Sequence, residues 1–162
     1  DVFLFADSLY NNITLFNPEI SKEQVITAAK TIGVHDFIES LPGGYDYNVK
    51  ERGVMLSSGQ RQLIAFLRAY ISKPNILVLD EATSSVDSYS EEIIQKAIDT
   101  LTEGKTSIVI AHRLATVKNA SRIVVMDHGK IVEQGTHDEL LKIPDGFYAK
   151  LYEVQFAETP VL

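Results

Sequence analysis

The chain has 162 residues and a formal net charge of −7, because 22 acidic residues outnumber 15 basic ones. Hydrophobic residues make up 45% of the sequence, which is enough for a packed core and unlike a disordered chain. The absence of cysteine excludes disulfide scaffolds, cysteine-ligated zinc and thiol catalysis. The acidic balance gives no general attraction to nucleic acid, and no apolar run is long enough to cross a bilayer. The composition therefore predicts about one domain without a nucleic-acid partner.

The first half of the chain has helical patterns. The N-terminal stretch has no initiator methionine and no basic flank, so we expect a fragment or a processed product without a signal peptide. Apolar residues at helical spacing follow Ser21 and end at Gly33, which predicts a helix with a serine N-cap. Residues 45–54 follow a proline–glycine break and are expected to form a loop or short extended structure. A second helix is predicted from Ser57 to about Ile71.

After Pro74 the pattern changes to alternating strands and helices. Short apolar runs at residues 76–79 and 107–111 flank a helical stripe at residues 91–101. This order predicts a right-handed crossover and a mostly parallel sheet, and the unbroken apolar runs predict strands covered on both faces. The fold class is therefore α/β.

The end of the chain has a different pattern. Two more apolar runs, residues 122–126 and 130–133, are separated by a short turn and predict a hairpin. Two short helices are expected near residues 138–141 and 146–153.

Two adjacent acids end the first predicted strand. Ligands bind at the carboxyl ends of strands in α/β sheets, so Asp80 is placed to hold a hydrated magnesium ion. Glu81 points elsewhere and is placed to orient and deprotonate an attacking water. The alternative interpretation is that both acids only keep the strand end soluble.

Residues 56–60 lie at the start of the second predicted helix. Small residues there let backbone amides approach an anion, and the helix dipole adds to the attraction. Ser57 is equally a plain N-cap, and Gly59 a flexible position, with no phosphate required. Arg61 and Arg68 follow on the same helix and could face phosphate, although for Arg68 we expect a solvated helix face.

Together these segments resemble the ATP-binding cassette (ABC) transporter ATPases. Residues 56–60 resemble the signature motif, residues 76–81 the Walker B strand, and residues 82–87 the D-loop, while His112 stands where the switch histidine belongs. The resemblance implies a partial P-loop NTPase (ABC ATPase) fold with a mostly parallel sheet. It further implies a helical signature subdomain at residues 1–73 and the Walker B half of the core at residues 74–162.

The resemblance also implies cofactors and residue roles. ATP and Mg²⁺ are the implied cofactors, with Asp80 as the metal ligand and Glu81 and His112 as catalytic residues. Nucleotide-binding roles are implied for Ser57, Ser58, Gly59, Gln60, Ser85 and Asp87. In the family, two cassettes face each other head to tail, so the signature motif of one contacts the ATP held by the other.

One motif of the family is missing. The phosphate-cradling pattern G-x-x-x-x-G-K-[ST] is absent, and residues 104–106 only resemble its end, because they lead from a helix into a strand. The adenine-stacking aromatic residue and the Q-loop glutamine are also missing. We therefore expect the C-terminal portion of a cassette that is inactive alone, with an open sheet edge that favours aggregation. Ser58 and Lys50 each stand where the family commonly has glycine.

The resemblance narrows to the exporter branch. Residues 47–53 resemble the loop that reaches the coupling helices of the membrane domain, with Glu51 as the expected contact. The implied function is to couple ATP hydrolysis to the export of a lipid, drug or peptide at the cytoplasmic face of the cell membrane. Two alternatives are a non-transport ABC ATPase of the DNA-repair or chromosome-structuring type and a non-catalytic module that keeps only the fold.

Overall fold

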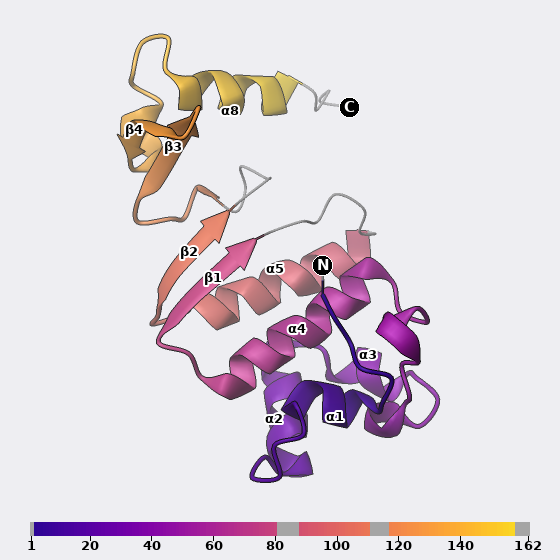
Figure 1. Cartoon of the computed structure of the whole chain (residues 1–162). Helices are drawn as coiled ribbons and strands as arrows, with labels where there is room; N and C mark the ends of the chain where they lie inside the picture. The colour runs from indigo at the N-terminus through magenta and orange to yellow at the C-terminus, as the bar shows by residue number, and fades with distance from the viewer. Residues whose placement is uncertain (1, 81–87, 111–116, 158–162) are drawn as a thin grey trace. The chain divides into compact units, whose positions relative to one another are not determined.

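The computed structural model describes residues 2–80, 88–110 and 117–157, and it divides into two compact units, Asp1–Val109 and Ile110–Leu162 (Figure 1). The first unit contains α1 (Leu9–Thr14), α2 (Lys22–Ile32), α3 (His35–Glu39), the 3₁₀ turns η1 (Gly44–Asp46) and η2 (Glu51–Gly53), α4 (Ser58–Ser72), β1 (Ile76–Asp80), α5 (Ser88–Thr102) and all but the last residue of β2 (Thr106–Ile110). The second unit contains β3 (Ile123–Asp127), β4 (Lys130–Gly135), α7 (His137–Leu140) and α8 (Phe147–Ala157). The predicted boundary between residues 73 and 74 separates functional regions and stays a prediction.

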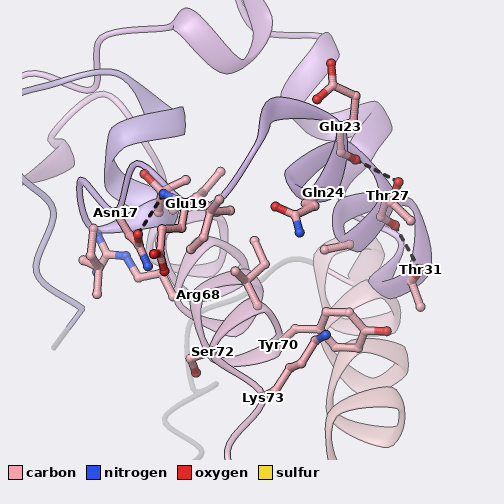
Figure 2. Close-up of a pocket in the computed structure, with 16 residues that line it drawn as sticks. Asn17, Glu19, Glu23, Gln24, Thr27, Thr31, Arg68, Tyr70, Ser72 and Lys73 are labelled. Atoms are coloured by element: carbon pink, nitrogen blue, oxygen red, sulfur yellow. Dashed lines mark hydrogen bonds between the residues drawn. The ribbon is translucent and has the colours of Figure 1, made fainter.

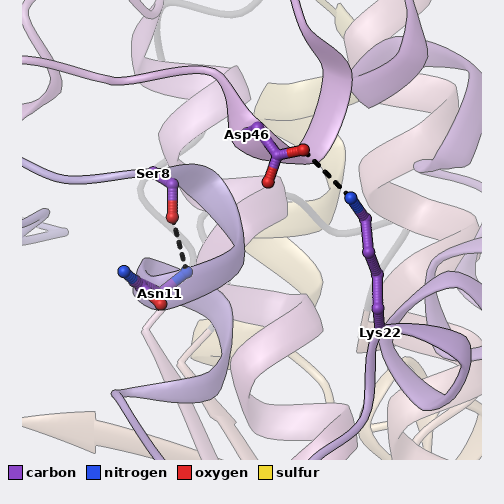
Figure 3. Close-up of polar contacts among 4 residues, drawn as sticks. All are labelled: Ser8, Asn11, Lys22 and Asp46. Atoms are coloured by element: carbon purple, nitrogen blue, oxygen red, sulfur yellow. Dashed lines mark hydrogen bonds and ion pairs between the residues drawn. The ribbon is translucent and has the colours of Figure 1, made fainter.

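Local capping confirms the predicted helix α2. Ser21 accepts a hydrogen bond from the backbone N–H of Gln24, whose side chain accepts one from the N–H of Ser21. The helix ends at Gly33, which has a φ of 81° and lets the chain leave in the left-handed conformation. The structure also contains α1, a six-residue helix that the predicted elements do not include. Ser8 caps α1 by accepting from the N–H of Asn11 (Figure 3).

Helix α4 is the centre of the first unit and packs against α1, α2 and α5. Its buried face carries Leu63, Ile64 and Leu67. An exposed ion pair between Lys22 and Asp46, 3.0 Å apart, joins the start of α2 to η1 (Figure 3). Exposed pairs of this kind contribute little, so the apolar burial around α4 holds the unit together.

Strands β1 and β2 are joined through α5 and point the same way, as predicted (Figure 1). Leu77 and Leu79 of β1 are buried in the same core as the apolar residues of α5. The other face is open, since Ile76 and Val78 are 64% and 63% exposed, and Ile108 and Ile110 of β2 are also exposed. The prediction that both faces are covered is therefore wrong for the described chain, because its helices cover one face only.

The second unit is built on the predicted hairpin. Strands β3 and β4 are antiparallel, with Asp127 opposite Lys130. Both turn residues have positive φ, 46° at His128 and 76° at Gly129, which is the conformation that two-residue hairpins favour. The unit's buried cluster contains Ile123, Leu140 and Tyr148.

A carboxylate on β4 caps α8. The two oxygens of Glu133 accept hydrogen bonds from the backbone N–H groups of Phe147, at 2.7 Å, and Tyr148, at 2.9 Å. A negative charge at a helix N-terminus is also favourable to the helix dipole. Glu133 thus joins the hairpin to the last helix.

The loop between η1 and α4 has a strained backbone at Lys50. This residue has a φ of 59° and a ψ of −174°, a region that is nearly confined to glycine. The Oδ1 atom of Asn48 accepts from the Lys50 N–H at 2.9 Å and helps to hold this conformation. At Gly53, with a φ of 64°, an added Cβ would lie 2.6 Å from the Cδ1 atom of Leu4. The loop therefore packs closely on the N-terminal segment.

We expect Lys50→Gly to stabilise the first unit. Glycine relieves the backbone strain at position 50 but also gives the unfolded chain more entropy. The net effect should raise the free energy of unfolding by about 1 kcal/mol. Lys50→Ala is the matched control, because it removes the side chain but keeps the Cβ that causes the strain. Urea denaturation followed by circular dichroism measures both, and equal effects of glycine and alanine would contradict the prediction.

Candidate functional site

The N-terminus of α4 presents the signature-like residues. Ser57 is the N-cap, and its Oγ accepts from the Gln60 N–H at 3.2 Å, while the Gln60 side chain accepts from the Ser57 N–H at 3.0 Å. The Ser57 hydroxyl therefore uses one acceptor position and keeps its own proton for donation. Ser57 and Ser58 are exposed, whereas Gly59 is buried. The N-cap interpretation of Ser57 is confirmed, and it is compatible with a further bond to a ligand.

The electrostatics of this helix end favour an anion. Helix α4 has 15 residues, and its first turn contains no acidic residue. Its dipole therefore places uncompensated positive potential beside the exposed hydroxyls. Arg61, one turn further on, donates a hydrogen bond from its Nη1 atom to the Leu56 carbonyl at 2.6 Å and so stabilises the turn that precedes the helix. The N-terminus of α4 can accept a phosphate group at the surface.

Asp80 ends β1 with an exposed side chain. Helix α4 and strand β1 run in opposite senses, so the N-terminus of α4 and the C-terminal end of β1 lie toward the same end of the first unit (Figure 1). Glu81, Ser85, Asp87 and His112 lie outside the described residues, and their implied roles stay predictions.

A magnesium site at Asp80 would depend on the nucleotide. Within residues 2–80, 88–110 and 117–157 no group of three or more His, Asp or Glu side chains could hold a metal ion. Magnesium commonly binds one or two carboxylates together with substrate phosphates and waters. An exposed carboxylate at a strand end fits that mode.

Arg68 lines an open groove between α1, α2 and the end of α4, but none of the residues with an implied catalytic, nucleotide-binding or metal role does (Figure 2). The hydroxyls of Thr27 and Thr31 on its α2 side donate to carbonyls of their own helix, those of Glu23 and Thr27. These polar groups are thus used within the helix.

Arg68 corrects an expectation. The sequence predicts a solvated helix face at Arg68, but Arg68 is half-buried and donates to the carbonyl of Asn12 at 2.6 Å and to that of Phe3 at 2.8 Å. Burial lowers the pKa of its guanidinium group from the ordinary value. The partners lie 56 and 65 residues away along the chain, so no local pattern indicates these bonds.

The chain belongs to the ABC transporter family, because the family model described as ABC transporter matches residues 2–84, just over half of the sequence. The family resemblance and the α/β ABC ATPase fold are thereby confirmed. A solved bacterial Atm1-family ABC exporter with ATP bound is similar in structure, with a TM-score of 0.83 and 40% identity, over 96% of this chain and 27% of that chain.

Several curated relatives match almost the whole chain. The ATP-dependent lipid A-core flippase of Legionella pneumophila (strain Lens) is 54% identical over 155 residues, 96% of this chain and 26% of that protein. The alpha-hemolysin translocation ATP-binding protein HlyB of Escherichia coli O6:H1 is 53% identical over 96% of this chain and 22% of that protein. The chain thus spans about a quarter of the length of these relatives. No helix among the described residues combines the length and apolar character needed to cross a membrane.

The capping role of Ser57 predicts a specific stability pattern. Ser57→Ala removes the acceptor for the Gln60 N–H and should lower the free energy of unfolding by about 1 kcal/mol. Ser57→Asp restores an acceptor at the N-cap and should keep the stability of the unmutated chain. Ser58→Ala is the neighbouring control and should have little effect. Urea denaturation measures all three, and equal stability of the alanine and aspartate variants at position 57 would contradict the prediction.

Proposed function

We propose that this chain is part of the nucleotide-binding domain of an ABC exporter, which couples ATP binding and hydrolysis to transport across the membrane. The observation that carries the proposal is the capped, acid-free and exposed N-terminus of α4 in a chain of the ABC transporter family. Residues 1–73 would form the helical signature subdomain and residues 74–162 the Walker B half of the core. The names of the relatives, a lipid A-core flippase and a hemolysin translocation protein, favour export of a lipid or a polypeptide.

The residues would act on two ATP molecules. The Ser57 hydroxyl and the backbone N–H groups of Ser58 and Gly59 would donate to the γ-phosphate of ATP held by a second cassette, and Gln60 holds Ser57 in place. Asp80 would hold Mg²⁺ at the chain's own nucleotide. The ion, when bound, neutralises charge on the phosphates.

The remaining predicted residues would complete the site. Glu81 would orient the attacking water and accept its proton, and His112 would hold the water and the γ-phosphate in line. Ser85 and Asp87 of the D-loop would contact the facing cassette. Positioning of this kind dominates phosphoryl transfer.

An exposed aromatic surface supports a partner in the membrane domain. Phe3, Phe5 and Phe16, which we call the docking face, are 58%, 42% and 52% exposed. The ring of Phe5 makes edge-to-face contacts with those of Phe3, at 5.2 Å, and Phe16, at 5.6 Å.

The predicted coupling loop contacts the segment that carries two rings of this docking face. Gly53 of the loop packs against Leu4, the buried residue between Phe3 and Phe5, and the side chain of Glu51 is exposed. Clustered exposed aromatic residues are typical of interaction sites. The docking face and Glu51 would receive the coupling helices, and the chain would then act at the cytoplasmic side of the membrane.

We expect the 162-residue chain alone neither to bind MgATP tightly nor to hydrolyse it, because it lacks the phosphate-cradling motif. Isothermal titration calorimetry with MgATP and a phosphate-release assay measure both properties, with Glu81→Gln as the matched variant. Tight binding together with phosphate release that Glu81→Gln abolishes would show a phosphate cradle in this chain and overturn the prediction.

The function itself is tested in a chimera in which residues 2–157 replace the matching segment of the Legionella lipid A-core flippase. We expect this chimera to hydrolyse ATP and to be stimulated by lipid A, and Glu81→Gln should lower turnover at least about a hundredfold. Ser57→Asp should also lower turnover, because the added charge repels phosphate although the helix cap remains. A well-folded chimera without ATP turnover, or one stimulated by DNA instead, would contradict the proposed function.

A further inference from the structure

Arg68 joins the signature helix to two distant segments. Its Nε donates to the carbonyl of Asn12 at 2.6 Å, its Nη2 to the Asn12 Oδ1 atom at 3.0 Å, and its Nη1 to the carbonyl of Phe3 at 2.8 Å. The guanidinium group is planar, so three bonds in one fork fix both the distance and the orientation of these segments. The position of α4 is thereby fixed relative to α1 and to the N-terminal segment.

Asn12 continues this connection to Phe5. Its side chain is fully buried, and its Oδ1 atom accepts from the Phe5 N–H at 2.8 Å while its Nδ2 atom donates to the Phe5 carbonyl at 3.0 Å. The amide therefore binds the Phe5 backbone as a neighbouring strand would. Since Arg68 binds Phe3 and Asn12 binds Phe5, the backbone that carries two rings of the docking face is held from α4 and α1.

The hydrogen bonds of Arg68 indicate that this residue orients the segments that it binds. All three acceptors that the structure describes for Arg68 are neutral oxygens, on Asn12 and Phe3. Burial also opposes the charge of this group and lowers its pKa. A half-buried cation of this kind is weak evidence for stability, because apolar side chains of similar volume often pack as well. Its particular contribution is the fixed orientation of the segments that it binds.

We propose that Arg68 and Asn12 form a latch that fixes the docking face to α4, the helix that begins at the signature motif. Arg68 is then a positioning residue: when the membrane domain contacts the docking face, the latch passes that movement to α4 and so sets the position of Ser57. The inference rests on the proposed function and adds a residue outside the signature motif to it. The docking face and Ser57 are at different places on the unit, and α4 is the rigid element between the latch and the motif. Loss of the latch would let the docking face move without α4.

The latch is tested first in the 162-residue chain, where no nucleotide is needed. In hydrogen exchange measured by mass spectrometry, Arg68→Met should speed exchange at residues 3–7, because the Phe5 N–H loses a fixed partner. Ile64→Val is the matched control, since Ile64 is fully buried on the same helix and makes no bond to the latch. Its small loss of stability should leave exchange at residues 3–7 unchanged. Unchanged exchange in Arg68→Met, or equal acceleration in both variants, would overturn the latch.

The coupling role is tested in the flippase chimera. Arg68→Met should reduce the ratio of lipid A-stimulated to basal ATP turnover to about one, and Arg68→Lys should restore part of the ratio by keeping one charged donor. Ile64→Val should keep the ratio of the unmutated chimera at the same temperature. A full ratio in Arg68→Met overturns the coupling role. An unmutated chimera without ATP turnover contradicts the proposed function instead, while hydrogen exchange still decides whether the latch exists.

Discussion

The burial of one face of α4 is the interaction on which the first unit depends. Leu63, Ile64 and Leu67 are each removed from water, and burial of such a side chain contributes about 1.5–3 kcal/mol. Helices α1, α2 and α5 all pack on this face or beside it. Because the helix is held along its length, its N-terminus can remain exposed without fraying, and the capping box at Ser57 completes the end.

The same helix connects the two surfaces that the proposed function needs. Its first turn presents Ser57, and Arg68 further along binds the segment with the exposed aromatic rings. The strained loop at Lys50 packs beside that segment through Gly53. The buried core around α4 therefore holds the helix N-terminus at Ser57 and the docking face at fixed positions. Rigid elements usually support functional loops in this way.

The open face of β1 and β2 shows where local pattern misleads. Four apolar residues there, Ile76, Val78, Ile108 and Ile110, predict cover on both sides, yet all are exposed in the described chain. The residues of a strand suit the neighbours that it has in the whole protein. The curated relatives are about four times as long as this chain, so such neighbours can lie outside it. An exposed apolar strand pair of this kind favours association. We expect an upstream segment of a cassette to cover it.

The sequence by itself determined α2, α4 and the β3–β4 hairpin, because capping residues, helical spacing and turn residues act within a few positions of one another. It also determined the family, since its motifs are short and contiguous. Only the tertiary structure decided the partners of Arg68 and Asn12, the strained conformation of Lys50 and the short helix α1. The bonds of Arg68 join segments 56 and 65 residues apart, and the free energy of such long-range packing has no local signal.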